Sequence, residues 1–265
     1  MGAPRRDEMG MVSDRALEMM MQVAVPQSLD SLSRAEMIMR RFQAAISVGV
    51  LNVGDRLPPE STLSEHLGVS PLTLRHGLHM LRDKGLVDTR RGRGGGSIIS
   101  GQVEILDEDI DERLGCISTD DLKDLFDVAA TIARGAARLG AMRADEQDVS
   151  WMRSRNAQFL SEVDSPGLRR ADGRFHISLG VAAQSRQITS LLVRIQTDVA
   201  PISWHSEEIS SRKLEAYEEH EAIIAAIAAG DVELADSLGA VHFESEQILA
   251  VERHLKLVTN ETRTP

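Results

Sequence analysis

The segment from residue 56 to residue 100 constrains the fold more than any other part of the 265-residue chain. The prolines at 58–59 can begin a helix, because a first helical turn leaves backbone N–H groups unpaired and proline has none. Gly68 can end that helix, since glycine adopts positive φ at little cost. Ser70 can cap a second helix that starts at Pro71. These signals predict two short helices joined by a tight turn.

The second helix would have one apolar and one polar face. Leu74, Leu78 and Leu81 form a stripe with helical spacing. After Gly85 a short apolar strand leads into a turn of three arginines and four glycines, and residues 97–99 return as a second strand. Basic side chains on such a turn suit contact with DNA phosphates or the minor groove. The segment therefore predicts a helix-turn-helix with a two-stranded wing, which places its second helix in the major groove.

A generic helical hairpin with a solvated basic loop would explain each signal singly, but not their order. Residues 33–100 resemble the winged-helix domain of the GntR family of bacterial transcription regulators, through GDRLPPESTLSEHLGVSPLTLRHGLHMLRDKGLV and the following RRGRGGG. Family members commonly carry arginine where this chain has Ser61 and Pro71, so the family's usual operator is not carried over. Thr73 and Arg75 match family positions at the DNA surface. The residues expected to contact DNA are Ser61, Ser70, Thr73, Arg75, His76, Arg90, Arg91, Arg93 and Gly94.

Charge is unevenly distributed along the chain. The net charge is −11, of which residues 1–100 contribute +2 and residues 101–265 contribute −13. An acidic protein with one basic segment is typical of a DNA-binding protein whose second domain has a different function. Aromatic residues make up only 3% of the chain, which argues against single-strand binding by base stacking. The single cysteine, Cys116, excludes an internal disulfide and indicates a reducing, cytoplasmic location.

Residues 1–32 are expected to form an extension with a short helix in its apolar run, residues 16–25. This run is too short to span a bilayer. Ser33 and Glu36 have the spacing of a capping box at the start of the next helix. From Ser118 onward helical patterns follow one another without a strand pattern, which predicts an antiparallel helical bundle. The expected organisation, mainly α, is an extension at 1–32, a winged helix-turn-helix domain at 33–100, a linker at 101–117, an all-α antiparallel bundle at 118–258 and a tail at 259–265.

Three histidines and one aspartate are candidates for a metal site in this bundle. Asp172 and His176 are four residues apart, so they share one face of a helix. His220 and His242 lie on the apolar stripes of two later helices. A hydrogen-bonded core is the other interpretation for any one of them. One divalent cation would satisfy all four groups, and imidazole with carboxylate suits zinc, nickel, iron or manganese.

The same residues resemble the FCD domain, the ligand-binding domain of the FadR branch of the GntR family. The resemblance covers residues 118–250, through DGRFH at 172–176, HEAI at 220–223, GD at 230–231 and AVH at 240–242. It implies one metal ion, with zinc expected first, and open positions for a small-molecule effector such as an organic acid. The implied metal ligands are Asp172, His176, His220 and His242.

The first bundle helix departs from the family pattern. Where FCD domains usually have valine-arginine and a following glutamate, this chain has Val128-Ala129 and Ala133. The missing arginine often holds an acid effector, so a simple carboxylate effector is in doubt. Arg134 and Arg138 are candidate effector-binding residues, although both could be surface charges.

These observations favour a homodimeric, metabolite-responsive repressor that binds double-stranded operator DNA and makes no contact with membranes. A metal sensor, in which the ion itself is the signal, is one alternative. A metal-dependent enzyme is the other, with Glu246 as the general base, but a fused DNA-binding domain does not fit an enzyme. We expect no catalytic activity.

Overall fold

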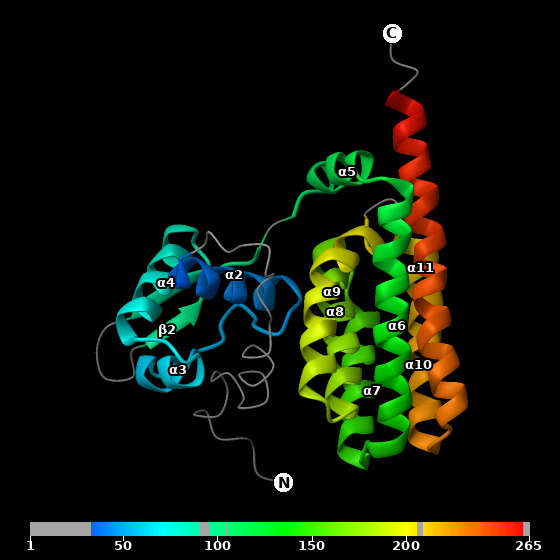
Figure 1. The fold of residues 1–265 in the computed structure, drawn as a ribbon, viewed down its shortest axis with the longest axis horizontal. Helices are drawn as coiled ribbons and strands as arrows, with labels where there is room; N and C mark the ends of the chain where they lie inside the picture. The colour runs from blue at the N-terminus through cyan, green and yellow to red at the C-terminus, as the bar shows by residue number, and fades with distance from the viewer. Residues whose placement is uncertain (1–32, 91–95, 104, 206–208, 262–265) are drawn as a thin grey trace. The chain divides into compact units, whose positions relative to one another are not determined.

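The structure, a computed structural model, describes residues 33–90, 96–103, 105–205 and 209–261 (Figure 1). The chain divides into two compact units, Met1–Val103 and Glu104–Pro265. The short helix expected within residues 1–32 lies outside the described residues. In the parts that the structure describes, no helix is both long and apolar enough to cross a membrane.

The helices of the first unit begin at the residues expected to cap them. Ser33 and Glu36 close a capping box at the start of α2 (Arg34–Ser47), each side chain accepting the other's backbone N–H. Pro59 occupies the N-cap position of α3 (Glu60–His66). Ser70 accepts the backbone N–H of Thr73 at the start of α4 (Pro71–Asp83). The turn between α3 and α4 contains Gly68 with φ of +62°.

The core of this unit lies between α2 and α4. Leu74, Leu78 and Leu81 are fully buried, as is Phe42 on α2. Strand β1 (Val87–Arg90) pairs antiparallel with β2 (Gly96–Ile99), with Val87 opposite Ile99 and Arg90 opposite Gly96. These elements confirm the winged helix-turn-helix fold. The tip of the wing, residues 91–95, lies outside the described residues.

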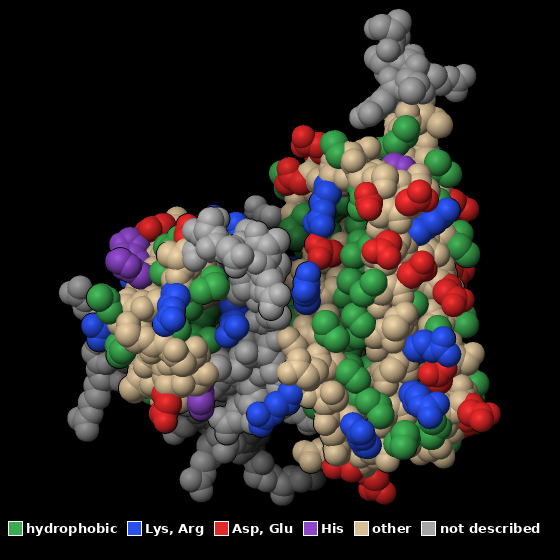
Figure 2. Space-filling model, viewed as in Figure 1, with side chains coloured by type: hydrophobic (Ala, Val, Ile, Leu, Met, Phe, Trp, Pro, Cys, Tyr) green, Lys and Arg blue, Asp and Glu red, His purple; other side chains and the backbone are tan. Residues whose placement is uncertain are grey.

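The second unit is a bundle of helices, which confirms the all-helical fold predicted for it (Figure 1). Its long helices are α6 (Thr119–Arg143), α7 (Glu146–Ser161), α8 (Ser165–Ala182), α9 (Arg186–Ser203), α10 (Ile209–Ala229) and α11 (Val232–Glu261). Helices α6 and α11 lie side by side over much of their length (Figure 1). Asp and Glu side chains are spread over the visible face of the bundle in Figure 2, in keeping with its negative charge.

The structure differs from the sequence prediction over residues 101–117, where we expected a linker. Helix α5 (Asp107–Cys116) occupies most of that range and belongs to the second unit. Its Ile110 and Leu114 are buried. Three acidic residues in its first turn complement the positive helix end. Asp107 and Asp111 pair with Arg169 and Arg253 of the bundle, which holds α5 in place.

Candidate functional site

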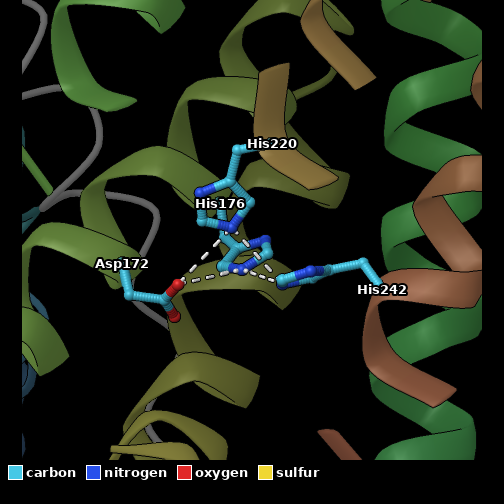
Figure 3. A group of neighbouring side chains, drawn as sticks. All are labelled: Asp172, His176, His220 and His242. Atoms are coloured by element: carbon cyan, nitrogen blue, oxygen red, sulfur yellow. Dashed lines mark hydrogen bonds and ion pairs between the residues drawn. The ribbon is translucent and has the colours of Figure 1, made fainter. Parts of the chain in front are cut away.

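Helix α8 supplies two of the four candidate metal ligands. Asp164 caps its start by accepting the backbone N–H of Gly167. The helix is buried on most of its surface, so Asp172 and His176 are 1% and 0% exposed. His220 comes from α10 and His242 from α11, and both are equally buried. One ligand atom from each of the four lies within 4.8 Å of the others (Figure 3).

The three imidazole rings direct their Nε2 atoms to a common centre (Figure 3). His242 Nε2 lies 3.2 Å from His176 Nε2 and 3.4 Å from His220 Nε2. Asp172 Oδ1 lies 3.5 Å from His176 Nε2 and 3.6 Å from His220 Nε2. The four side chains therefore meet as the sequence predicted.

Two outer residues determine where the ring protons lie. His220 Nδ1 is 3.0 Å from Asn156 Oδ1, and this oxygen can only accept a hydrogen bond. His242 Nδ1 is 2.6 Å from Glu219 Oε2, which as a carboxylate also accepts. Each ring donates its Nδ1 proton outward, so in the neutral imidazole the Nε2 lone pair faces the centre. Such outer partners fix the tautomer of metal-binding histidines in proteins.

The centre is a convergence of acceptors that fits a cation. Both oxygens of Asp172 are buried and have no hydrogen-bond partner among the described residues. A buried carboxylate in that condition is unfavourable unless a positive charge accompanies it. Together with two inward Nε2 lone pairs, it provides the oxygen and nitrogen donors that divalent transition metals bind.

Electrostatics around the cluster keep His220 neutral but favour a proton on His242. Burial, reinforced by the neighbouring His242, His176 and Arg212, holds the pKa of His220 well below its ordinary value, so this ring is neutral. Burial opposes ionisation of Glu219, but its bonds to His242 and Arg212 outweigh this and lower its pKa to about 2. Burial alone would lower the pKa of His242, yet the carboxylates of Glu246 and Glu219 raise it.

The sequence did not reveal the residues that surround the four candidate ligands. Asn156, Glu219 and Arg212 are absent from the predicted site. Arg212 donates from both terminal nitrogens to Glu219, at 3.0 and 2.7 Å. The adjacency of Glu219 and His220 gave no signal, because Glu219 bonds to His242 of another helix. Asn156 is 64 residues from His220 in sequence.

The structure does not bring Arg134 and Arg138 to the cluster. Both side chains are on the exposed side of α6. The Arg134 guanidinium is paired with Asp236 of α11, with Nε 3.1 Å from the carboxylate oxygen. The buried face of α6 carries Ala129 and Ala133 instead.

Four of the expected DNA-contacting residues lie at the start of α4, namely Ser70, Thr73, Arg75 and His76. Arg75 and His76 are exposed on α4, and Ser61 is exposed on α3. Arg75 Nε donates to Glu60 at 2.8 Å, in a solvent-accessible pair. Ser70 is occupied as the N-cap, with its oxygen 2.8 Å from the hydroxyl of Thr73. Of the wing residues, Arg91, Arg93 and Gly94 lie outside the described residues, and only the backbone of Arg90 is described.

Comparison with known proteins gives matches over both units. Residues 25–95 match the family described as bacterial regulatory proteins, gntR family, and residues 124–245 match the FCD domain family. Over 243 residues the chain is 34% identical to the HTH-type transcriptional regulator RmpR of Mycobacterium gastri, covering 89% of this chain and 87% of that protein. It is 28% identical over 214 residues to the HTH-type transcriptional regulator LutR of Bacillus subtilis, covering 77% and 96%. It is 35% identical over 115 residues to the Glc operon transcriptional activator of Escherichia coli, covering 43% and 44%.

Proposed function

The chain belongs to the GntR family of bacterial transcription regulators and carries an FCD domain, and from that premise we propose that it is a metabolite-responsive repressor with a divalent metal ion in its effector bundle. The family is one of regulators rather than enzymes, so the alternative function of a metal-dependent enzyme is rejected. The observation that carries the proposal is the buried convergence of Asp172, His176, His220 and His242. One donor atom of each lies within 4.8 Å of the others, and the Nε2 lone pairs of His220 and His242 face the centre.

The proposed ligand set favours zinc, with nickel, iron and manganese as the alternatives. Imidazole nitrogen and carboxylate oxygen are common ligands of all four ions. The ion would polarise an oxygen atom of the effector and fix its position within the bundle. We therefore place the effector beside the histidine cluster.

Regulation is proposed to occur by a shift between two states of the bundle. An effector that binds one state more tightly than the other shifts their populations, whereas one that binds both equally shifts nothing. The state of the bundle would determine how the two winged-helix domains of a dimer are positioned to bind the two halves of an operator.

A homodimer is supported by an apolar stripe on the surface of α11. Leu234, Val241, Ile248 and Leu255 are spaced seven residues apart, which keeps them on one side of a helix. Each is between 45% and 60% exposed. Contiguous exposed apolar side chains on a soluble protein commonly mark an interaction surface. We propose a second copy of the chain as the partner, because a two-fold operator calls for a two-fold protein.

The proposal is tested by operator binding. Genomic fragments selected by the purified protein supply the operator, and fluorescence anisotropy then gives its affinity for metal-loaded and metal-free protein with a panel of small oxygen-bearing metabolites. We expect one metabolite to change operator affinity at least about fivefold in the metal-loaded protein, the low end of allosteric coupling. A protein that selects no DNA, or whose affinity no metabolite changes, would refute the proposal.

A metal sensor is the second candidate. Operator affinity that responds to the ion alone, with no metabolite present, would favour it in the same experiment. We rank it second, because a fully buried ligand cluster suits a permanent ion better than a signal that must enter and leave.

A further inference from the structure

Glu246 is buried next to His242, and so far only its effect on the pKa of that histidine has been described. It stands on α11 one turn after His242 and is 2% exposed. Its Oε2 accepts a hydrogen bond from Ser203 Oγ at 2.8 Å. Its Oε1 is buried and has no hydrogen-bond partner among the described residues. A buried carboxylate oxygen without a hydrogen bond requires an explanation.

The position of Oε1 suggests what that oxygen is for. It lies 3.4 Å from His242 Nε2. This equals the separation of the His220 and His242 Nε2 atoms and is close to the 3.5 Å between Asp172 and His176. Oε1 therefore stands at the distance from His242 that separates donors around one ion.

The neighbouring cation does not account for Oε1. Arg212 is the buried cation whose charge acts on Asp172, Glu219 and Glu246. Both of its terminal nitrogens bond to Glu219. Its charge is thus shared among three carboxylates, and two of them, Asp172 and Glu246, keep buried oxygens without a hydrogen bond.

We propose that Glu246 is a fifth protein donor to the metal ion, and that the effector reaching this ion is a neutral oxygen compound, such as a hydroxyl or carbonyl compound, rather than a carboxylate. The inference rests on the proposed metal site. The charges of Asp172 and Glu246 balance a divalent ion, so an anionic effector would gain little attraction and would meet the Glu246 carboxylate.

The walls around the cluster support this choice of effector. Ala129, at the position where FCD domains usually have the arginine that holds an acid, is fully buried, and it packs with Ala133 in an apolar cluster that includes Phe126 and Phe243. No side chain of this α6 face therefore replaces the missing cation.

Gln196 of α9 supplies neutral hydrogen-bonding groups at the same level of the bundle. It is fully buried, and neither atom of its amide has a hydrogen-bond partner in the described part of the chain. Helices α8 and α9 pack together with Gly180 against Thr189. Counting about two turns on from Thr189 in α9 and about two turns back from Gly180 in α8, which run antiparallel, we infer that Gln196 lies level with Gly173, the residue after Asp172. An amide can both donate to and accept from a hydroxyl or carbonyl compound.

The test uses full-length protein loaded with Co²⁺, whose visible absorption reports its ligands, and the isosteric substitution Glu246→Gln. Glu244→Gln is the control, because Glu244 is exposed on the same helix. We expect Glu246→Gln to weaken Co²⁺ binding at least about tenfold and to change the visible spectrum, while the control does neither. Glu246→Asp, which keeps the carboxylate, should recover part of the affinity if the loss is not a folding defect.

Acetate and glycerol then serve as probes of effector class. We expect acetate to leave the Co²⁺ spectrum of the parent unchanged and to alter that of Glu246→Gln, and glycerol to alter that of the parent. Unchanged affinity and spectrum in Glu246→Gln, or a parent that responds to acetate as strongly as the variant, would overturn the inference. If the parent binds Co²⁺ through the four predicted ligands, and Glu246→Gln has the same Co²⁺ affinity and spectrum as the parent, only this inference fails. If the parent takes up no Co²⁺, the proposed metal site fails with it.

Discussion

At the residue scale, the site depends on lone pairs that outer partners turn inward. Helical periodicity predicts that Asp172 and His176 share a face, and the apolar stripes around His220 and His242 predict that both point inward. The convergence of these four side chains could therefore be predicted from sequence. Asn156 could not, because it is 64 residues from the ring it orients and no local pattern joins them.

Removing that outer partner tests its role. Asn156→Ala removes the acceptor at Nδ1 of His220, so the ring can carry its proton on Nε2 instead. The loss of such outer partners typically weakens metal binding about 10–100-fold. Ser154→Ala, an exposed change on the same helix, should have no effect. Chelator competition gives both affinities. Equal affinities for the two variants would show that Asn156 does not orient the ring.

The pH dependence of metal binding should follow from His242. Its carboxylate neighbours raise its pKa against the effect of burial, so the metal-free ring keeps a proton to higher pH than usual. A metal ion must displace that proton. Affinity should fall as pH falls through the raised pKa, and level off above it. Calorimetric titrations between about pH 9 and about pH 6, around the ordinary imidazole value of about 6.5, in buffers of different ionisation enthalpy should detect proton release. Binding that is independent of pH and releases no proton would contradict this account.

At the element scale, helices that begin at a local cap could be predicted from the sequence, whereas a helix held in place by distant contacts could not. The caps at Ser33 and Ser70 act within one helical turn, so the starts of α2 and α4 could be read from the sequence. Helix α5 could not, because only Ile110 and Leu114 mark its buried face and its ion pairs reach Arg169 and Arg253, far along the chain.

The close packing of α8 on α9 gives a prediction at this scale. A Cβ at Gly180 would lie 2.8 Å from Thr189 Cα and 2.9 Å from Leu192 Cδ1. Gly180→Ala should therefore lower the free energy of unfolding by about 1–3 kcal/mol through overpacking. The matched change Gly135→Ala meets nothing within 4 Å in α6 and should raise it by up to about 1 kcal/mol through helix propensity. Urea unfolding of the metal-free proteins measures both. A stabilising Gly180→Ala would show that the helices are less tightly packed.

At the scale of the whole molecule, the chain joins a DNA-binding unit to a bundle with a buried polar centre and an apolar outer stripe. Nothing in the sequence pattern separated that stripe from core positions, because α11 has apolar residues on several faces. Only its exposure in the structure identifies Leu234, Val241, Ile248 and Leu255 as a surface.

The proposed dimer predicts the effect of a charge in that stripe. Ile248 is 60% exposed, so Ile248→Glu should fold normally but place two carboxylates at the interface. Sedimentation equilibrium should show a dimer for the parent and a monomer for the variant, with metal content unchanged. Leu214→Glu is the control, at a 56% exposed site on α10 outside the stripe. A dimeric Ile248→Glu variant would place the interface elsewhere.

The central claim is that the four inner residues hold one metal ion, and metal content tests it most directly. Inductively coupled plasma mass spectrometry on the purified protein, His176→Ala and His220→Ala should find close to one equivalent of metal in the parent and little in either variant. His254→Ala is a suitable control, because this buried histidine bonds to Thr119 and the Leu114 carbonyl instead of the cluster. No metal in the parent after reloading, or metal that both cluster variants retain, would contradict the claim and leave the four residues as a hydrogen-bonded core.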